Sequence, residues 1–122
     1  MYDHIGLRVH DLGRSLSFYE RVLAPLGHAV QSKGDDYAGL GPKGAAALWL
    51  HQLPQGAGPG LGVHIAFTAP SREAVQRFHA AGLAAGARDN GAPGPRPDYG
   101  DTYYAAFLID EEGNNVEAVC MR

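Results

Sequence analysis

The order of structural elements in this chain is indicated first by the stretch HIGLRVHDLGRSLSFYERVL, residues 4–23. From 4 to 9, apolar residues alternate with polar or small ones, the period at which side chains of a β-strand point to opposite faces. Asp11 follows as a typical helix N-cap, and apolar residues then recur at helical spacing from 12 to 23. Pro25 ends the helical pattern. The chain is therefore predicted to open with a strand followed by an amphipathic helix.

Three short segments complete the first half of the chain, separated by residues that favour turns. Strands are expected at 28–32, 37–40 and 45–51. Residues 53–62 then hold four glycines and two prolines. Because this density of glycine and proline disfavours both helix and strand, it predicts a linker.

The same pattern begins again after the linker. An offset of sixty residues pairs His4 with His64 and Phe18 with Phe78, with the same order of elements. The expected elements are a strand at 63–68, a helix at about 71–86, and a hairpin of strands at 102–109 and 115–121. Residues 88–100 hold six glycines or prolines, so we expect a long loop there that lies over the mouth of a cavity and helps to select the substrate.

If the two halves of the chain are two copies of one unit, the sequence predicts eight strands and two helices in total. We expect an α+β fold in which two tandem βαβββ modules form a curved mixed sheet around a cavity, with the helices outside. The chain is then a single domain, 1–122, with module 1 at about 1–52, the linker at 53–62 and module 2 at about 63–122.

The composition excludes several classes of partner. Ten Lys and Arg against thirteen Asp and Glu give a net charge of -3, and no basic run is present, so we expect no nucleic-acid partner. The longest apolar run, residues 45–50, is too short to cross a bilayer, so we expect no membrane partner. Cys120 is the only cysteine, and the chain opens without a targeting segment, which predicts a cytoplasmic protein.

Side chains that alternate with the apolar set of each repeated strand could meet on the concave side of the sheet. His4 and His64 hold equivalent positions in the two modules, and Glu117 projects from the last strand. Two imidazoles and one carboxylate suit iron(II), manganese, nickel or zinc and leave coordination positions for substrate or water. The alternative is that both histidines are ordinary solvated or hydrogen-bonded strand residues and that Glu117 is an outward-facing charge.

Four stretches carry a resemblance to a known family. They are HIGLRV at 4–9, the pairs DL, RS and FY between 11 and 19, GVHIAF at 62–67 and DEEGNNVE at 110–117. In these, the chain resembles the vicinal oxygen chelate superfamily, which contains glyoxalase I, bleomycin-resistance proteins, fosfomycin-resistance thiol transferases and extradiol dioxygenases. The resemblance covers essentially the whole chain. It implies one divalent metal ion, and it places His4, His64 and Glu117 on three of the family's usual metal-ligand positions.

The fourth ligand position differs from that of glyoxalase I, which carries a glutamate where this chain has Trp49. An indole offers no lone pair to a metal, so Trp49 is expected to form a wall of the core or cavity and to bind substrate. The remaining three-ligand set is more similar to those of the dioxygenases and the fosfomycin thiol transferases. His51, on the same strand face as Trp49, is an alternative fourth ligand.

Other polar and aromatic residues are candidates for binding the substrate or for acid chemistry. Arg8 shares a strand face with His4, and glyoxalases that resemble this chain use an arginine there to hold glutathione; the alternative is a surface arginine. Tyr103 and Tyr104 are expected to point to opposite faces, so one of them faces the cavity. The expected catalytic residues are Glu117 and Tyr103, and the expected substrate-binding residues are Arg8, Trp49, Arg96, Tyr99 and Tyr104.

Three functions remain open at this point. The first is a divalent-metal-dependent enzyme of the lyase, isomerase or thiol transferase type that acts on a small oxygenated substrate. The second is a ferrous extradiol-type dioxygenase, and the third is a metal-free protein that binds a small molecule, as bleomycin-resistance proteins do. We also expect a homodimer, because each module leaves a strand edge and a curved face that one chain cannot cover.

Overall fold

The first half of the chain forms a four-stranded mixed sheet covered by one helix. The computed structural model describes all residues, 1–122. The elements of module 1 are β1 (Ile5–Val9), α1 (Leu12–Leu23), the short 3-10 helix η1 (Ala24–Leu26), β2 (Ala29–Lys33), β3 (Tyr37–Gly41) and β4 (Leu48–Gln52). The strands lie in the order β1-β4-β3-β2, with β1 parallel to β4 and the other pairs antiparallel. As the sequence predicts, Asp11 caps α1, and its side chain accepts a hydrogen bond from the Arg14 amide.

The second half repeats this arrangement. The elements of module 2 are β5 (His64–Thr68), α2 (Arg72–Ala84), β6 (Arg88–Pro95), β7 (Tyr103–Ile109) and β8 (Asn115–Met121). They form a second sheet in the order β5-β8-β7-β6, in which β5 and β8 run parallel. Ser71 caps α2 by accepting a hydrogen bond from the Ala74 amide. The prediction of an α+β fold built from two βαβββ modules is therefore confirmed.

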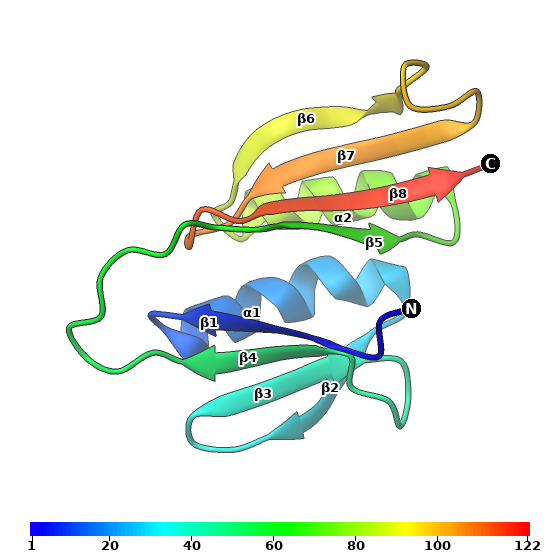
Figure 1. Ribbon diagram of the computed structural model, residues 1–122. Coiled ribbons are helices and arrows are strands. Elements are labelled where there is room, and N and C mark those ends of the chain that lie inside the picture. The colour runs from blue at the N-terminus through cyan, green and yellow to red at the C-terminus, as the bar shows by residue number, and fades with distance from the viewer.

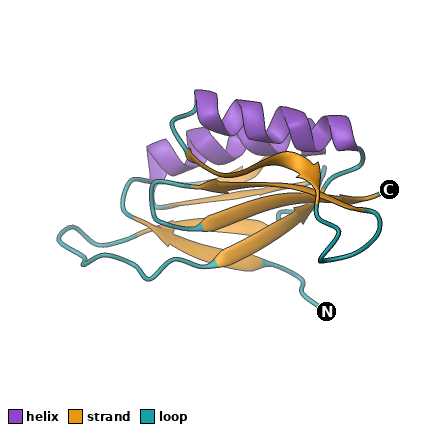
Figure 2. Ribbon diagram, turned by 90° about the horizontal axis from the view of Figure 1, so that it is seen from above, coloured by secondary structure: helices purple, strands orange, loops and turns teal.

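Both helices lie on the same side of the strands, and the opposite side carries no helix (Figure 2). Alternate strand residues and the apolar stripes of the helices form the core between these layers; its largest fully buried side chains include Tyr19, Phe78 and Leu108. We call the uncovered strand surface the open face; Gly6, Trp49, Ala66 and Glu117 lie on it. Neither helix has the length and the apolar character needed to cross a membrane.

The two modules pack together through α1 and η1 of module 1 and α2 of module 2. Their facing edge strands, β1 and β5, run in opposite directions (Figure 1). No ladder of hydrogen bonds joins them, so each module keeps its own sheet. Because the strands are antiparallel, the start of β1 lies beside the end of β5. His4 and Thr68 accordingly line one crevice at this seam, while Arg8 and Val63 line another.

The prediction of a loop at 88–100 is wrong for the first eight of these residues. They form β6 at the outer edge of the second sheet (Figure 1). Proline lacks an amide hydrogen, but an edge strand can tolerate that loss where it is not paired and where it bulges. The register of β6 against β7 shifts on both sides of Gly91, whose φ of 150° requires a glycine. Only residues 96–102 connect the two strands as a loop.

Candidate functional site

Three side chains of module 2 meet on the open face. Glu117 lies on β8, between β5 and β7, and its side chain is 3% exposed. His64, the first residue of β5, places Nε2 3.1 Å from Oε1 of Glu117. Tyr103, the first residue of β7, donates its hydroxyl hydrogen to Oε2. The carboxylate is therefore held between an imidazole and a phenol that come from the two flanking strands.

The strand register explains why these side chains meet. Glu117 is the Cα partner of Ala66 on one side and of Phe107 on the other. Since residues an even number apart share a strand face, His64 points the same way as Ala66, and Tyr103 the same way as Phe107. The small side chain of Ala66 leaves space beside the carboxylate.

The hydrogen bond made by Nδ1 of His64 determines whether Nε2, which faces Glu117, carries a hydrogen. Nδ1 lies 3.0 Å from the carbonyl oxygen of Asn115, so Nδ1 carries the hydrogen of that bond. In a neutral ring Nε2 then has a lone pair and no hydrogen. A lone pair facing a carboxylate oxygen at 3.1 Å is unfavourable unless a positive charge lies between them. The pair therefore needs a cation, either a proton on Nε2 or a metal ion bound to both groups, and its donor set fits a divalent metal.

Tyr103 is a hydrogen-bond donor in this cluster over the physiological pH range. Burial, the hydrogen bond to Glu117 and the charge of Glu117, in that order, raise the pKa of Tyr103 to about 12. Tyr99 packs edge-on against it, with the ring centroids 5.3 Å apart. The phenol thus keeps its hydrogen and holds one carboxylate oxygen in place.

An aromatic ring of β7 stacks on His64, and a guanidinium group of the β6–β7 loop packs on that ring. The Phe107 ring stacks on His64 at a centroid distance of 6.3 Å, and the Arg96 guanidinium lies 5.4 Å from the Phe107 centroid. Arg96 also donates hydrogen bonds to the carbonyl oxygens of Ala92, at 2.7 Å, and Gly94, at 2.8 Å. Its guanidinium therefore fastens the bulged end of β6.

Within one chain, the structure does not bring His4 to this cluster. The His4 side chain is 59% exposed, and its Nδ1 lies 2.7 Å from Oδ1 of Asp3. His4 lines a seam crevice of about 600 Å³ together with Thr68, at the end of β5. His64 lies at the other end of β5, roughly 13 Å away along a strand of this rise. No three His, Cys, Asp or Glu side chains in the single chain gather closely enough for one metal ion.

The open face of module 1 carries aromatic and basic side chains. Trp49 packs against Tyr37 with the ring centroids 6.2 Å apart. Gly39 makes room for the indole, because a Cβ atom there would lie 2.7 Å from Cζ3 of Trp49. Arg8 and His51 are strand partners and line a pocket of about 390 Å³. This surface combines an aromatic wall with a guanidinium group.

Comparison with known proteins agrees with this architecture. Residues 2–118 match the model of the Glyoxalase/Bleomycin resistance protein/Dioxygenase superfamily. The chain belongs to this superfamily. A glyoxalase/bleomycin resistance protein from Albidiferax ferrireducens T118 is 31% identical, with a TM-score of 0.84 and 98% of each chain covered.

Two more distant members of the fold are also similar. A glyoxalase/bleomycin resistance protein/dioxygenase family enzyme from Burkholderia phytofirmans PsJN is 19% identical, with a TM-score of 0.71 and 98% of each chain covered. TioX from Micromonospora sp. ML1 is 17% identical, with a TM-score of 0.69, and the match covers 100% of this chain and 99% of TioX. At these identities the likeness shows the fold alone. A comparison with curated proteins finds no match.

In this superfamily member, the two neighbouring tyrosines have different surroundings. Tyr103 faces Glu117, whereas Tyr104 is buried on the helix side, where its hydroxyl accepts a hydrogen bond from Nε2 of Gln76 at 2.9 Å. Tyr99 is 67% exposed beside Tyr103. The open face therefore receives Tyr103 and Tyr99, and Tyr104 lies away from it.

Sequence reasoning missed two groups that orient His64. Phe107 has a signal in the sequence, because it lies four residues after Tyr103 and so shares its strand face. The carbonyl oxygen of Asn115 has none, since a backbone acceptor is set by the pairing of β5 with β8 and every residue type carries one.

Proposed function

We propose that this protein is a divalent-metal-dependent enzyme of the lyase, isomerase or thiol transferase type that acts on a small oxygenated substrate. The observation that carries the proposal is the His64–Glu117 pair, whose imidazole nitrogen and carboxylate oxygen face each other at 3.1 Å, and a divalent metal ion bound to both groups would supply the cation between them. These two residues would hold iron, manganese, nickel or zinc. Such an ion, when bound, supplies Lewis acidity toward two neighbouring oxygens of a substrate.

The other residues of the site position Glu117 and receive the substrate. Tyr103 engages one oxygen of Glu117, so the other stays directed at His64. The cluster holds a single carboxylate, whereas glyoxalase-type isomerisation relies on two. Chemistry that needs one carboxylate, such as thiol addition, therefore fits this site better. Arg8 and Trp49 offer a guanidinium and an aromatic surface to an anionic, partly aromatic substrate.

We propose that a second copy of the chain completes the site with its own His4. No helix covers the open face (Figure 2), and Tyr99 of the β6–β7 loop and Met121 of β8 are 67% and 60% exposed. Two open faces packed together would cover this surface and could set His4 of the partner subunit against His64 and Glu117. The single cysteine, Cys120, is buried, and we expect this homodimer in the reducing cytoplasm.

Metal content tests the proposed chemistry. Elemental analysis of protein purified without chelator should show about one divalent ion per chain, and the variants His64→Ala and Glu117→Ala should lose it. His79→Gln is the matched control, because His79 lies on α2, away from the open face, and pairs there with Asp89, so it should leave the metal content unchanged. A wild-type chain that stays metal-free after dialysis against each of the four metals would contradict the proposal.

Mixed dimers test whether two copies share the site. His4→Ala and His64→Ala should each lose metal as homodimers. When the two variants are unfolded and refolded together, each mixed dimer regains one intact site, made of His4 from one chain with His64 and Glu117 from the other. Metal should then return to about half of the dimer's sites in the mixed species. If mixing restores nothing, the site is not shared in this way.

The aromatic pairs Tyr37–Trp49 and Tyr99–Tyr103 favour a second candidate, a metal-free small-molecule binder. In that case planar aromatic ligands should quench the fluorescence of Trp49 equally well with and without chelator.

The dioxygenase alternative rests on the His-His-Glu set, and iron(II)-loaded protein should then consume oxygen with a panel of catechols.

A further inference from the structure

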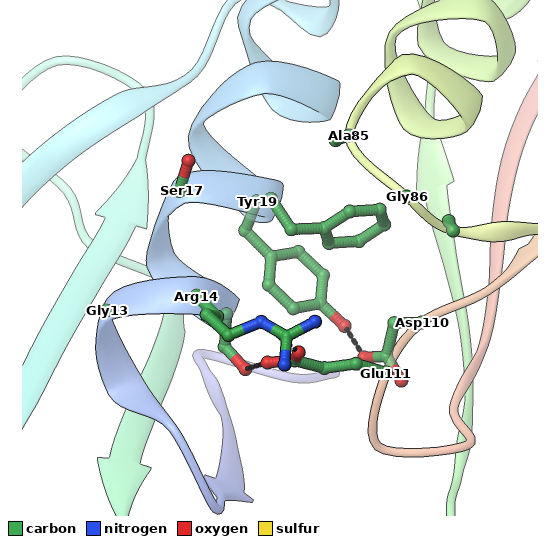
Figure 3. Close-up of a pocket in the computed structure, with 11 residues that line it drawn as sticks. Gly13, Arg14, Ser17, Tyr19, Ala85, Gly86, Asp110 and Glu111 are labelled. Atoms are coloured by element: carbon green, nitrogen blue, oxygen red, sulfur yellow. Dashed lines mark hydrogen bonds and ion pairs between the residues drawn. The ribbon is translucent and has the colours of Figure 1, made fainter.

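The turn between β7 and β8 joins module 2 to module 1 through consecutive acidic residues. Asp110 accepts a hydrogen bond from the buried Tyr19 hydroxyl at 2.7 Å, and Glu111 pairs with Nε of Arg14 at 3.0 Å. Figure 3 shows Tyr19 and Arg14 of α1 pointing toward these two residues at the edge of a pocket of about 260 Å³. The third acidic residue, Glu112, lies next in the turn and has a different kind of partner.

Glu112 binds His10, which follows directly after β1. The His10 backbone amide donates to Oε1 of Glu112, and ring Nδ1 lies 2.6 Å from Oε2. Nε2 of the same ring lies 2.9 Å from the carbonyl oxygen of Gly58, in the linker. Both ring nitrogens therefore face acceptors. A neutral imidazole has only one N–H group, so only the protonated ring can donate to both.

The contact with Gly58 is the one hydrogen bond that ties residues 54–62 to the rest of the protein. The amide of Ala57 bonds only within the linker, to Pro54. Beyond this segment the chain is fastened again at Val63, just before β5. Leu53, at the start of the linker, is held by a hydrogen bond from its amide to Val9, so His10 supplies the hydrogen bond that holds residues 54–62.

We propose that His10 is a protonation-dependent tether of the linker 53–62. When charged, the ring holds Glu112 and Gly58 together. When neutral, it keeps its remaining hydrogen on Nδ1 for the carboxylate, because that hydrogen bond is the stronger one. Nε2 then presents a lone pair to the carbonyl oxygen of Gly58, and the linker is released. The mobility of the chain ahead of β5 thus changes with pH.

The groups around His10 place this change above pH 6.5, the ordinary pKa of a histidine. Glu112 is the charged side chain that faces the ring from the β7–β8 turn, and the linker presents only carbonyl groups. β4 contributes the neutral amide of Gln52, which donates to the His10 carbonyl oxygen, and Asp11 is turned toward the helix it caps. The hydrogen bond to Glu112 and then that to Gly58 raise the pKa of His10 above its ordinary value of 6.5.

NMR titration of the full-length ¹⁵N-labelled protein, without added metal, tests the tether. The His10 ring should titrate with a midpoint above 6.5, and the amide signals of Gly58 and Gly60 should shift with the same midpoint. Above that midpoint, hydrogen-exchange protection of the Ala57 amide, which bonds to Pro54 within the linker, should fall by roughly fivefold, the size expected for one ordinary hydrogen bond. If the linker signals stay constant while His10 titrates, this measurement on the wild-type protein is enough to overturn the proposal.

Two variants assign the effect to this ring. His10→Gln should abolish the titration of the linker signals, and Glu112→Gln should move its midpoint down toward 6.5. His79→Gln is the matched control, because His79 pairs with Asp89 at 2.9 Å within module 2 and should leave the linker titration intact. A linker that titrates in His10→Gln as it does in the wild type would assign the change to another group and refute the proposal.

Discussion

Replacing Tyr103 by phenylalanine should weaken the metal binding that we propose for His64 and Glu117, because it removes one hydroxyl group and preserves the ring. That hydroxyl donates to Oε2 of Glu117, whose side chain is only 3% exposed, so water cannot readily replace the lost donor. The other contact of the carboxylate, with His64 at 3.1 Å, is untouched. Loss of a hydrogen bond to a ligating side chain typically costs about 10- to 100-fold in metal affinity. This corresponds to roughly 1.4–2.7 kcal/mol of binding free energy.

The neighbouring residue provides the matched control for this substitution. Tyr104 is on the same strand but faces the helices, where its hydroxyl bonds to Gln76 at 2.9 Å. Isothermal titration calorimetry with zinc or nickel should therefore give an unchanged Kd for Tyr104→Phe and a Kd raised about 10- to 100-fold for Tyr103→Phe. Equal effects of the two substitutions, or an unchanged Kd in Tyr103→Phe, would refute the role given to this hydroxyl.

Three further outcomes follow from the structure. Tyr19→Phe should lower the free energy of unfolding by about 1.5–3 kcal/mol in urea titrations, since the carboxylate of Asp110 loses a buried donor; a change within experimental error would contradict this. Gly39→Ala should displace Trp49, because the new Cβ atom would lie 2.7 Å from the indole, and an unaltered fluorescence spectrum would count against that crowding. Folding raises the pKa of His10 above 6.5, so the stability that protonated His10 adds is complete below pH 6.5 and is lost as the pH rises through the pKa of His10 in the folded protein. His10→Gln should therefore flatten this part of the curve of unfolding free energy against pH, measured by urea unfolding.

Local patterns predicted the elements whose periodicity is strong. The alternation at 5–9 and the capped apolar stripe at 12–23 match β1 and α1, because the side chains that must be buried follow the period of the backbone itself. The sequence did not predict β6, because its residues lack such a periodic pattern. Its glycines and prolines favour a loop locally, and it is a strand because the edge of β7 offers it partners at some positions and lets it bulge at others.

In the candidate site, too, some features could be predicted from the sequence and others could not. Glu117 and His64 could be chosen from the sequence because the repeat assigns each to a strand face. The sequence named Tyr103 as catalytic and Tyr104 as substrate-binding, but it could not show which of the two faces Glu117, since either residue satisfies the alternation until the register of β7 against β8 is known. His4 shows the limit most clearly: its strand position equals that of His64, yet the antiparallel meeting of β1 and β5 puts the two at opposite ends of the seam.

The sequence by itself determined the two repeated modules, the face on which each side chain lies and the residue types available for chemistry. These properties depend on the period of the backbone and on neighbours close in the chain. Tertiary structure alone decided which of these side chains meet. The contacts of Glu117 with Tyr103, of Arg96 with the carbonyl groups of β6 and of His10 with Gly58 join strands, turns and linker whose relative placement arises from packing of the whole core.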